Sequence, residues 1–439
     1  MFIQKRLYIT IVFIILCFII GYVNIFIFTL AQILLLILLL LFGYEFFLLY
    51  FSAGKKPIDC IRQCSERFSN GDENEIRLHL SNNYHFTVSL QIIDEIPDIF
   101  QIRDLLFHLK INGKEDKVLK YSLRPVKRGV YKFGMINVFV TTKFGLISRR
   151  FKTGTPCDVK VYPSYIYLKQ YELQAATQKL KEQGNKLIRK TGQHLEPDHI
   201  KEYVKGDDYR VINWKATARR SKLMTNVFQQ ERAQNVYCLI DKGRTMQSAS
   251  NGMTLLDYSI NSSLALSYIA MFKGDKVGLL TFEKQLDTFI SASRQSGQMQ
   301  RIQEILYAQS TSFMESDFSA LYQRVIQHIK NRSLLLLFTN FDSVPAMQRQ
   351  LNYLSMIAKR HFVVVIFFEN TELEELLKKQ PQTKEDFYES VISEKLSHEK
   401  TMIINKLQQR NILSILANPN NLTVTTINKY LEIKARGVF

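Results

Sequence analysis

The chain contains the run Asn235-Val236-Tyr237-Cys238-Leu239-Ile240-Asp241, in which apolar residues lead directly to an acid. Further apolar runs follow at Lys276–Phe282, Ser333–Asn340 and Phe362–Phe368, and Leu255–Met271 shows a helical pattern. Continuous apolar strands that alternate with helices are typical of a parallel sheet covered on both faces. We therefore predict an α/β domain over residues 234–439.

The ends of these strands are the natural place for a binding site. Ligands of open parallel sheets bind beyond the carboxyl ends of the strands. Asp241 ends the first run, and Asn340 and Asp342 stand at the end of the third. We expect these three residues to lie together at one edge of the sheet.

The N-terminal segment from Leu7 to Phe51 carries no Lys, Arg or Asp, and its only formal charge is Glu45. A helix that crosses the hydrocarbon core needs roughly 20 residues, so this segment is long enough for two. The less apolar stretch Gly21–Thr29, which contains Asn24, suits a turn between helices at Leu7–Ile20 and Leu30–Phe51. Residues 1–55 are therefore predicted to form a transmembrane hairpin, and Glu45 is interpreted as an interfacial carboxylate. A functional carboxylate inside a helix bundle is the alternative.

The charges that flank this segment indicate its orientation. Lys5 and Arg6 precede it, and Lys55, Lys56 and Arg62 follow it, whereas the turn has no basic residue. By the positive-inside rule both ends should lie in the cytoplasm. A cleaved signal peptide is disfavoured, because no small-x-small site follows the first apolar run.

Residues 56–165 are predicted to form a small antiparallel β-sandwich. Polar and apolar residues alternate in Glu75–Leu80 and Phe86–Leu90, and turn-forming clusters occur at residues 70–72 and 112–113. Alternation with period two at this spacing is typical of antiparallel strands with one buried face.

Residues 166–233 form a basic linker with a dense charge pattern and the only tryptophan, Trp214. Asp207, Asp208, Arg210 and Arg219 are expected to form an internal latch of charge-assisted hydrogen bonds, with Trp214 packed beneath it. The alternative is that these charges face a partner, and the sequence leaves both interpretations open.

The core of this segment resembles the signature of the bacterial domain-of-unknown-function 58 family. The residues that carry the resemblance are Gly206, Asp207, Asp208, Arg210, Asn213, Trp214 and Arg219, within the run 206–219. It extends to Arg124–Tyr131, Asp241–Met246, Lys276–Phe282, Arg332–Phe341 and Asn428–Arg436. The resemblance implies a Rossmann-like von Willebrand factor A-like domain. It also implies a bacterial inner-membrane protein that works with MoxR-type AAA+ ATPases in complex assembly or stress functions.

Von Willebrand A domains often hold Mg²⁺ at a metal-ion-dependent adhesion site, so the resemblance implies a candidate site. Asp241 and Thr245 stand in the expected places and would be the ligands if a metal bound. Gly243 removes one hydroxyl, and Asn340 replaces the final acid, while Thr311 or Ser312 would supply the middle ligand. We therefore expect a degenerate site and no cofactor.

The formal charge of +18 favours an acidic partner, and an anionic bilayer satisfies this without nucleic acid. Five scattered cysteines fit a reducing compartment. The chain has no P-loop, nucleophile-elbow or His-Glu-x-x-His motif. We expect a membrane-anchored adaptor without enzymatic activity, whose soluble domains lie in the cytoplasm. A metal-dependent hydrolase or nuclease that uses the strand-end acids is the alternative.

Overall fold

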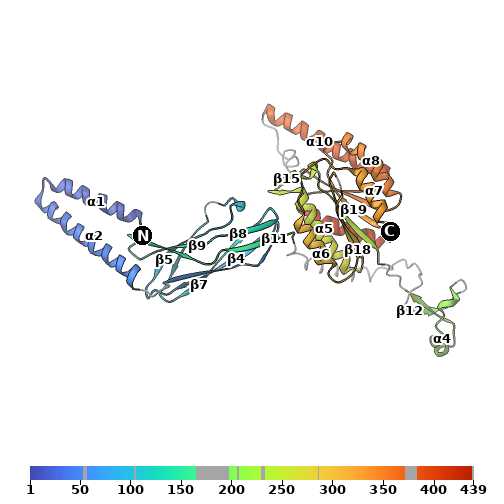
Figure 1. Ribbon diagram of the computed structural model, residues 1–439, viewed down its shortest axis with the longest axis horizontal. Helices are drawn as coiled ribbons and strands as arrows, with labels where there is room; N and C mark the ends of the chain where they lie inside the picture. The colour runs from blue at the N-terminus through green and yellow to red at the C-terminus, as the bar shows by residue number, and fades with distance from the viewer. Residues whose placement is uncertain are drawn as a thin grey trace. The chain divides into compact units, whose positions relative to one another are not determined.

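The computed structural model describes residues 1–52, 57–102, 105–164, 197–204, 207–228, 233–284, 286–370 and 383–437. The chain divides into two compact units, Met1–Ser164 and Tyr165–Phe439 (Figure 1). Lys55, Lys56 and Gly206, as well as most of the predicted linker, lie outside the described residues.

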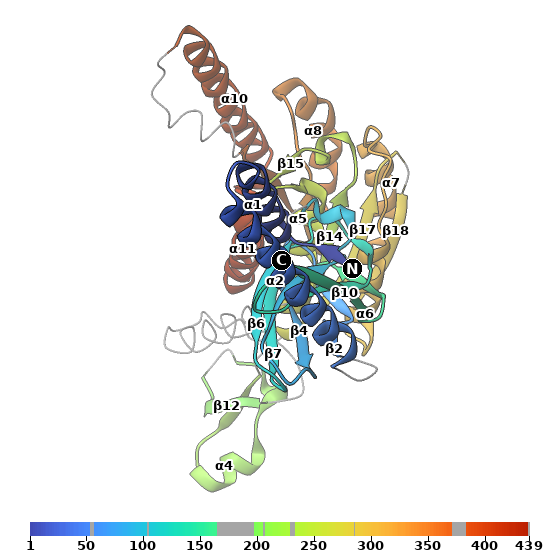
Figure 2. The ribbon, with the colours of Figure 1, turned by 90° about the vertical axis from the view of Figure 1, so that its left-hand side faces the viewer.

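Two successive helices, α1 (Lys5–Gly21) and α2 (Ile25–Phe51), begin the first unit. They lie side by side (Figures 1 and 2), and the rings of Phe18 and Phe28 meet with centroids 5.5 Å apart. The turn is shorter than predicted, because the Asn24 side chain accepts a hydrogen bond from the Phe26 N–H and caps α2 one residue later. Among the described residues, α2 is long and apolar enough to cross a membrane, by length and composition.

The remaining described residues of the first unit form three sheets. The first sheet has the strand order β1 (Phe2–Ile3), β10 (Ile147–Thr153), β9 (Ile136–Thr141), β5 (Val88–Asp94) and β6 (Leu106–Ile111). The second has the order β2 (Ile58–Gln63), β4 (Asn74–Asn82) and β7 (Asp116–Leu123). The third has the order β3 (Arg67–Ser69), β11 (Cys157–Tyr162) and β8 (Gly129–Phe133). All paired strands are antiparallel except β3 and β11.

Alternate residues of these strands build one hydrophobic core. Along β4, Ile76, Leu78 and Leu80 are buried while the residues between them are largely exposed, and Leu90 and Ile92 of β5 belong to the same core. This period-two burial confirms the antiparallel β structure predicted for the region.

The described part of the second unit starts with a small hairpin at residue 197. Strand β12 (Pro197–Glu202) pairs with β13 (Met224–Phe228), and between them lie the 3-10 turn η2 (Tyr209–Val211) and helix α4 (Trp214–Arg220). Asn213 caps α4, because its side chain accepts a hydrogen bond from the Ala216 N–H at 3.0 Å.

A six-stranded sheet forms the centre of the α/β region. Its strand order is β18 (Leu286–Ser293), β17 (Lys276–Phe282), β14 (Asn235–Asp241), β19 (Leu334–Phe338), β20 (Phe362–Phe368) and β21 (Leu413–Ala417). Only the pairing of β17 with β18 is antiparallel. The strand order reverses between β14 and β19, which is where ligands of doubly wound sheets bind.

Helices cover both faces of this sheet, as the continuous apolar strands predicted (Figure 1). Residues of α5 (Leu255–Phe272), α6 (Gln298–Ala308) and α11 (Leu422–Arg436) pack on one face. Residues of α7 (Phe318–His328), α8 (Val344–Ala358) and α10 (Lys384–Gln409) pack on the other. The sheet therefore carries two separate cores.

Candidate functional site

The carboxylate of Asp241 lies at the centre of the predicted edge, because β14 is flanked by β17 and β19. Its side chain is 1% exposed. One carboxylate oxygen accepts the Gly243 N–H at 2.8 Å and the Ser316 hydroxyl, and the other accepts the Thr339 hydroxyl at 2.6 Å. Burial raises the pKa of Asp241, although these hydrogen bonds oppose the rise. Both of its oxygens are therefore engaged by protein donors.

Gly243 has no side chain, and the hydroxyl of Ser316 fills the space where one would start. A Cβ on Gly243 would overlap the Ser316 Oγ and come within 3.1 Å of Asp241 Oδ1. The hydroxyl that Gly243 lacks is thus supplied by another loop. Ser316 is remote in sequence from Asp241, so the strand-end pattern gave no signal for it.

Thr311, the predicted middle ligand, lies in the same group of loops. Its hydroxyl donates to the carbonyl oxygen of Lys242 at 2.7 Å. A neighbouring acid, Glu283, accepts the Met314 N–H at 2.7 Å and the Ser312 hydroxyl at 2.9 Å. Partial burial acts to raise the pKa of Glu283, but these donors outweigh it and hold that pKa below its ordinary value. Residues 311–314 are therefore tied by hydrogen bonds to the loops that follow β14 and β17.

Asn340 binds a lysine from a distant helix. The Lys400 Nζ of α10 donates to Asn340 Oδ1 and to the Phe341 carbonyl oxygen, each at 2.8 Å. Burial lowers the pKa of Lys400 to about 8, against the opposing charge of Asp342. Thr245 is half-buried, and its carbonyl oxygen lies 3.5 Å from the Asn340 amide nitrogen. A protein ammonium group therefore stands beside the residue that replaced the final acid.

The structure places the predicted strand-end residues along one edge and adds three that the sequence did not single out. Asp241 and Gly243 share a hydrogen bond, Thr311 binds the intervening main chain, and Asn340 contacts Thr245. Asp342 is exposed. The missed residues are Ser316, Thr339 and Lys400, of which only Thr339 had a sequence signal, as the hydroxyl residue directly before Asn340.

The signature residues do not form the expected latch. Asp207 pairs with Lys201 at 2.9 Å, and Asp208 accepts the Arg210 N–H at 2.9 Å and caps a turn. Trp214 is 70% exposed, and the side chains of Arg210 and Arg219 are also exposed. The latch prediction was wrong because the aspartates bind near neighbours in sequence, as Asp side chains commonly do at turns. Asp208, Arg210, Trp214 and Arg219 are therefore exposed residues of the hairpin formed by β12 and β13.

Glu45 is fully buried against the loop before β10, so its carboxylate contacts protein groups and not solvent. Its carboxylate accepts the Thr142 hydroxyl and the N–H groups of Gly145, Leu146 and Ile147, the last three at 2.9, 3.0 and 3.1 Å. These donors compensate the cost of removing the charge from water. The side chain therefore joins α2 to the loop before β10.

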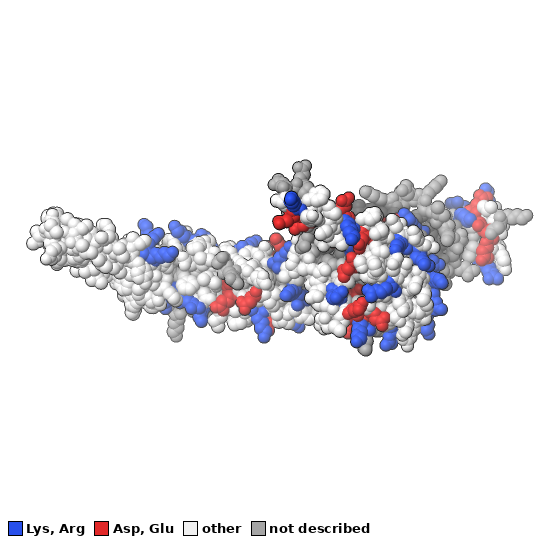
Figure 3. All heavy atoms as spheres, turned by 90° about the horizontal axis from the view of Figure 1, so that it is seen from above, with Lys and Arg blue, Asp and Glu red and all other residues white. Residues whose placement is uncertain are grey.

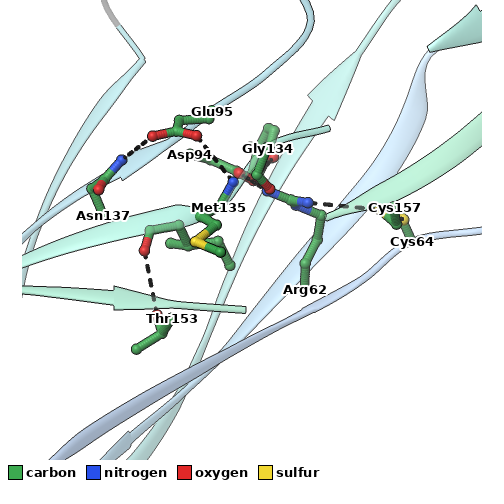
Figure 4. A network of polar contacts seen from close by, with 11 residues as sticks. Arg62, Cys64, Asp94, Glu95, Gly134, Met135, Asn137, Thr153 and Cys157 are labelled. Carbon is green, nitrogen blue, oxygen red and sulfur yellow. Dashed lines mark hydrogen bonds and ion pairs between the residues drawn. The ribbon is translucent and has the colours of Figure 1, made fainter. Parts of the chain in front are cut away.

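The first unit also contains a buried ion pair that the sequence analysis missed. Arg62 and Asp94 form a two-pronged contact, with both side chains at most 2% exposed (Figure 4). Arg62 also donates to the Gly134 carbonyl oxygen at 3.0 Å, and the Tyr121 hydroxyl donates to Asp94 at 2.5 Å. These contacts balance both charges inside the β core.

Together the helices, antiparallel sheets and mixed α/β region define a multidomain protein with an apolar N-terminal helix. Residues 199–382 match the family described as "Protein of unknown function DUF58", in agreement with the resemblance of the signature. The chain is 28% identical over 129 residues to the uncharacterized protein YeaD of Bacillus subtilis (strain 168). This alignment covers 29% of the chain and 32% of YeaD, so the chain matches about a third of the length of that relative.

Two solved structures show weak similarity. The CARDB domain of the PF1109 protein from Pyrococcus furiosus, in complex with di-metal ions, is 16% identical, with 25% of this chain and 96% of that chain covered and a TM-score of 0.19. Proximal thread matrix protein 1 from the mussel byssus is 11% identical, with 44% of this chain and 46% of that chain covered and a TM-score of 0.26.

Proposed function

We propose that this protein is a membrane-anchored interaction protein without enzymatic activity, which works with a MoxR-type AAA+ ATPase in complex assembly or stress response. The observation that carries the proposal is that Trp214, Arg210 and Arg219 are all exposed on the segment between β12 and β13. Tryptophan and arginine are enriched among the residues that dominate binding at protein interfaces. An exposed aromatic side chain among charged neighbours therefore fits a surface for a protein partner.

The α/β region is proposed to be von Willebrand factor A-like. Its support is the sheet, in which the first strand lies centrally and one edge strand is antiparallel, with Asp241 at the carboxyl end of that first strand. In such folds binding occurs at this edge. The edge would accordingly be a second surface for partner proteins.

The residues at this edge do not fit a magnesium ion. Mg²⁺ requires several oxygen ligands at short, near-octahedral positions. Both oxygens of Asp241 are held by protein donors, Ser316 fills the space beside Gly243, and the Lys400 ammonium group binds Asn340. A cation in the same place would meet the repulsion of that ammonium group. These contacts support an edge that binds a partner protein without a metal ion. Hydrolase or nuclease chemistry would instead need a metal held by convergent acids.

The membrane anchor is proposed to be a hairpin of α1 and α2. Both ends of the hairpin are held by the β sheets of the first unit. Before α1, strand β1 pairs with β10. Near the end of α2, the Leu49 carbonyl oxygen accepts hydrogen bonds from Tyr84 Oη at 2.9 Å and from Arg149 Nη1 at 2.6 Å. Helix ends that are held on one domain must lie on one side of the bilayer. The basic residues Lys5 and Arg6 before the hairpin, together with Lys55 and Lys56 after it in the sequence, then favour the cytoplasmic side of the bacterial inner membrane. Arg62 does not add to this charge, because it is paired with Asp94.

A co-purification experiment with a matched control tests the proposal. The full chain and the MoxR-type ATPase of the same bacterium are co-expressed, extracted in mild detergent and captured through the chain. Trp214→Ala should remove most of the captured ATPase, whereas Tyr388→Ala, at a residue that is 69% exposed outside the signature, should leave it unchanged. Failure of the unaltered chain to capture the ATPase, or equal loss in both variants, would contradict the proposal.

A further inference from the structure

We infer that the loop between β9 and β10, residues 142–146, is a second contact with the membrane. In this contact Phe144 enters the lipid interface, and Lys143 and Arg6 bind the headgroups of anionic phospholipids. The inference rests on the proposed membrane anchor and adds a lipid-binding site to it.

The first step is the depth of Glu45 along α2. The helix begins at Ile25, and the uncharged stretch up to Tyr44 is followed directly by Glu45. At 1.5 Å per residue, roughly 20 residues cover the ~30 Å thickness of the hydrocarbon core. With the start of α2 at one face of the hydrocarbon, Glu45 therefore lies at the opposite face.

The second step is that Glu45 fixes the loop at this depth. Its carboxylate accepts the N–H groups of Gly145 and Leu146 at 2.9 and 3.0 Å, as well as the Thr142 hydroxyl. These donors belong to both ends of the loop, and Glu45 is fully buried beneath them. The tip between them, Lys143 and Phe144, is consequently held where the hydrocarbon meets the headgroups.

The third step concerns the side chains that the tip presents. Phe144 is 47% exposed, although it is a large apolar residue, and Lys143 is exposed beside it. Arg6, at the start of α1, donates to the Phe144 carbonyl oxygen at 3.1 Å, and its neighbour Lys5 is exposed. Figure 3 shows basic side chains gathered where helices α1 and α2 meet the β sheets of the first unit.

An anionic lipid is the occupant that this combination fits. Tyrosine favours the membrane interface, and Tyr44 of α2 is exposed at this level. Phenylalanine is among the apolar side chains that interfacial segments bury at the boundary of headgroups and acyl chains, which suits Phe144 and the exposed Phe47. Lys and Arg near the surface are attracted to anionic headgroups. The cationic groups are continuous with the proposed membrane span, so a lipid headgroup reaches them without leaving the bilayer.

The depth of Phe144 can be measured by fluorescence in the full-length protein. Trp214→Phe removes the only tryptophan, and Phe144→Trp then places a single fluorophore at the loop tip. In lipid nanodiscs its emission maximum should lie at shorter wavelength than that of tryptophan in water. Lipids brominated near the headgroup end of the acyl chain should quench this emission. Val130→Trp on β8, at a residue that is 44% exposed, is the matched control and should not be quenched.

The outcomes separate the inference from the anchor on which it rests. If the protein floats with lipid vesicles but the fluorophore of the Phe144→Trp variant is not quenched, the inference is wrong and the anchor stands. If the protein does not float with vesicles, the anchor is wrong and the inference falls with it. Flotation together with quenching in the Phe144→Trp variant, and not in the Val130→Trp variant, supports both.

The headgroup preference is tested separately with short-chain lipids. Dioctanoyl phosphatidylglycerol should shift the emission of the Phe144→Trp variant at lower concentration than dioctanoyl phosphatidylcholine. Lys143→Gln should weaken phosphatidylglycerol binding roughly fivefold, as expected for one basic group at the surface. Lys132→Gln, at an exposed lysine on β8, should not weaken it. Equal affinity for the two lipids would overturn the headgroup assignment.

Discussion

The hydroxyl of Ser316 occupies the space that a side chain on Gly243 would fill, and it donates to the Asp241 carboxylate that Gly243 also contacts. In the sequence, Gly243 seemed only to lack a hydroxyl that could bind a metal. In the structure, its missing side chain leaves room for Ser316, whose hydroxyl comes from a different loop and hydrogen-bonds the Asp241 carboxylate.

This pairing predicts that Gly243→Ser is destabilising. The new side chain would displace Ser316 and its hydrogen bond to Asp241, at a cost of about 1–3 kcal/mol in the free energy of unfolding. Adding Ser316→Gly should recover much of the loss, because it restores the space and leaves one hydroxyl beside Asp241. Thermal unfolding of the full chain in detergent measures both, and a Gly243→Ser protein that melts like the unaltered chain would refute the pairing.

We predict that magnesium does not bind at the strand edge. The oxygens of Asp241 already accept hydrogen bonds, and the ammonium group of Lys400 lies against Asn340. Calorimetric titration of the full chain with Mg²⁺ should therefore give no saturable heat. Micromolar binding that disappears in Asp241→Asn would show that the site is functional after all.

The contacts of Glu45 predict that Glu45→Ala loosens the loop before β10. Each backbone N–H left buried without an acceptor costs about 1–3 kcal/mol, and Glu45 serves three of them. Hydrogen exchange at Gly145, Leu146 and Ile147 should become faster in detergent. Glu75→Ala, which removes an exposed carboxylate, is the control and should leave these amides unchanged.

The buried pair of Arg62 and Asp94 predicts an asymmetric response to substitution. Asp94→Leu leaves the Arg62 guanidinium buried without its counter-charge, so it should cost about 3–5 kcal/mol. Arg62→Met combined with Asp94→Leu should cost less, since neither charge then remains. Melting curves of the two variants decide this, and a double variant less stable than Asp94→Leu would argue against a charge imbalance.

His361 predicts loss of stability in acid. Both of its ring nitrogens are buried without a hydrogen-bond partner among the residues that the structure describes. Burial, with a contribution from Arg360, lowers the pKa of His361 below its ordinary value of 6.5. As the pH falls below about 6.5, the histidine binds a proton in the unfolded chain before it does so in the folded chain, so the free energy of unfolding decreases.

The acid sensitivity should be smaller in His361→Leu. Melting temperatures between about pH 7 and pH 5 should fall less in this variant than in the unaltered chain. His398→Leu, at an exposed histidine of α10, is the control and should retain the original dependence. An identical pH dependence in His361→Leu would exclude this histidine as the cause.

Much of the architecture followed from periodicity in the sequence. The continuous apolar run ending at Asp241 predicted a strand covered on both faces, and the alternation in Glu75–Leu80 predicted a strand with one buried face. These patterns are local, because a strand repeats every two residues and a buried strand needs apolar residues throughout. Parallel strands also align their carboxyl ends, which is why Asp241 and Asn340 could be placed on one edge.

The partners of the key side chains were decided by the tertiary structure alone. Ser316 reaches Asp241 and Lys400 reaches Asn340 from elements distant in sequence, and Glu45 is buried by a loop that follows it by 97 to 102 positions. Likewise, nothing local showed that Trp214 would be exposed. Sequence patterns determine which face of an element is apolar, whereas the contacts of a polar group depend on which loops the fold brings beside it.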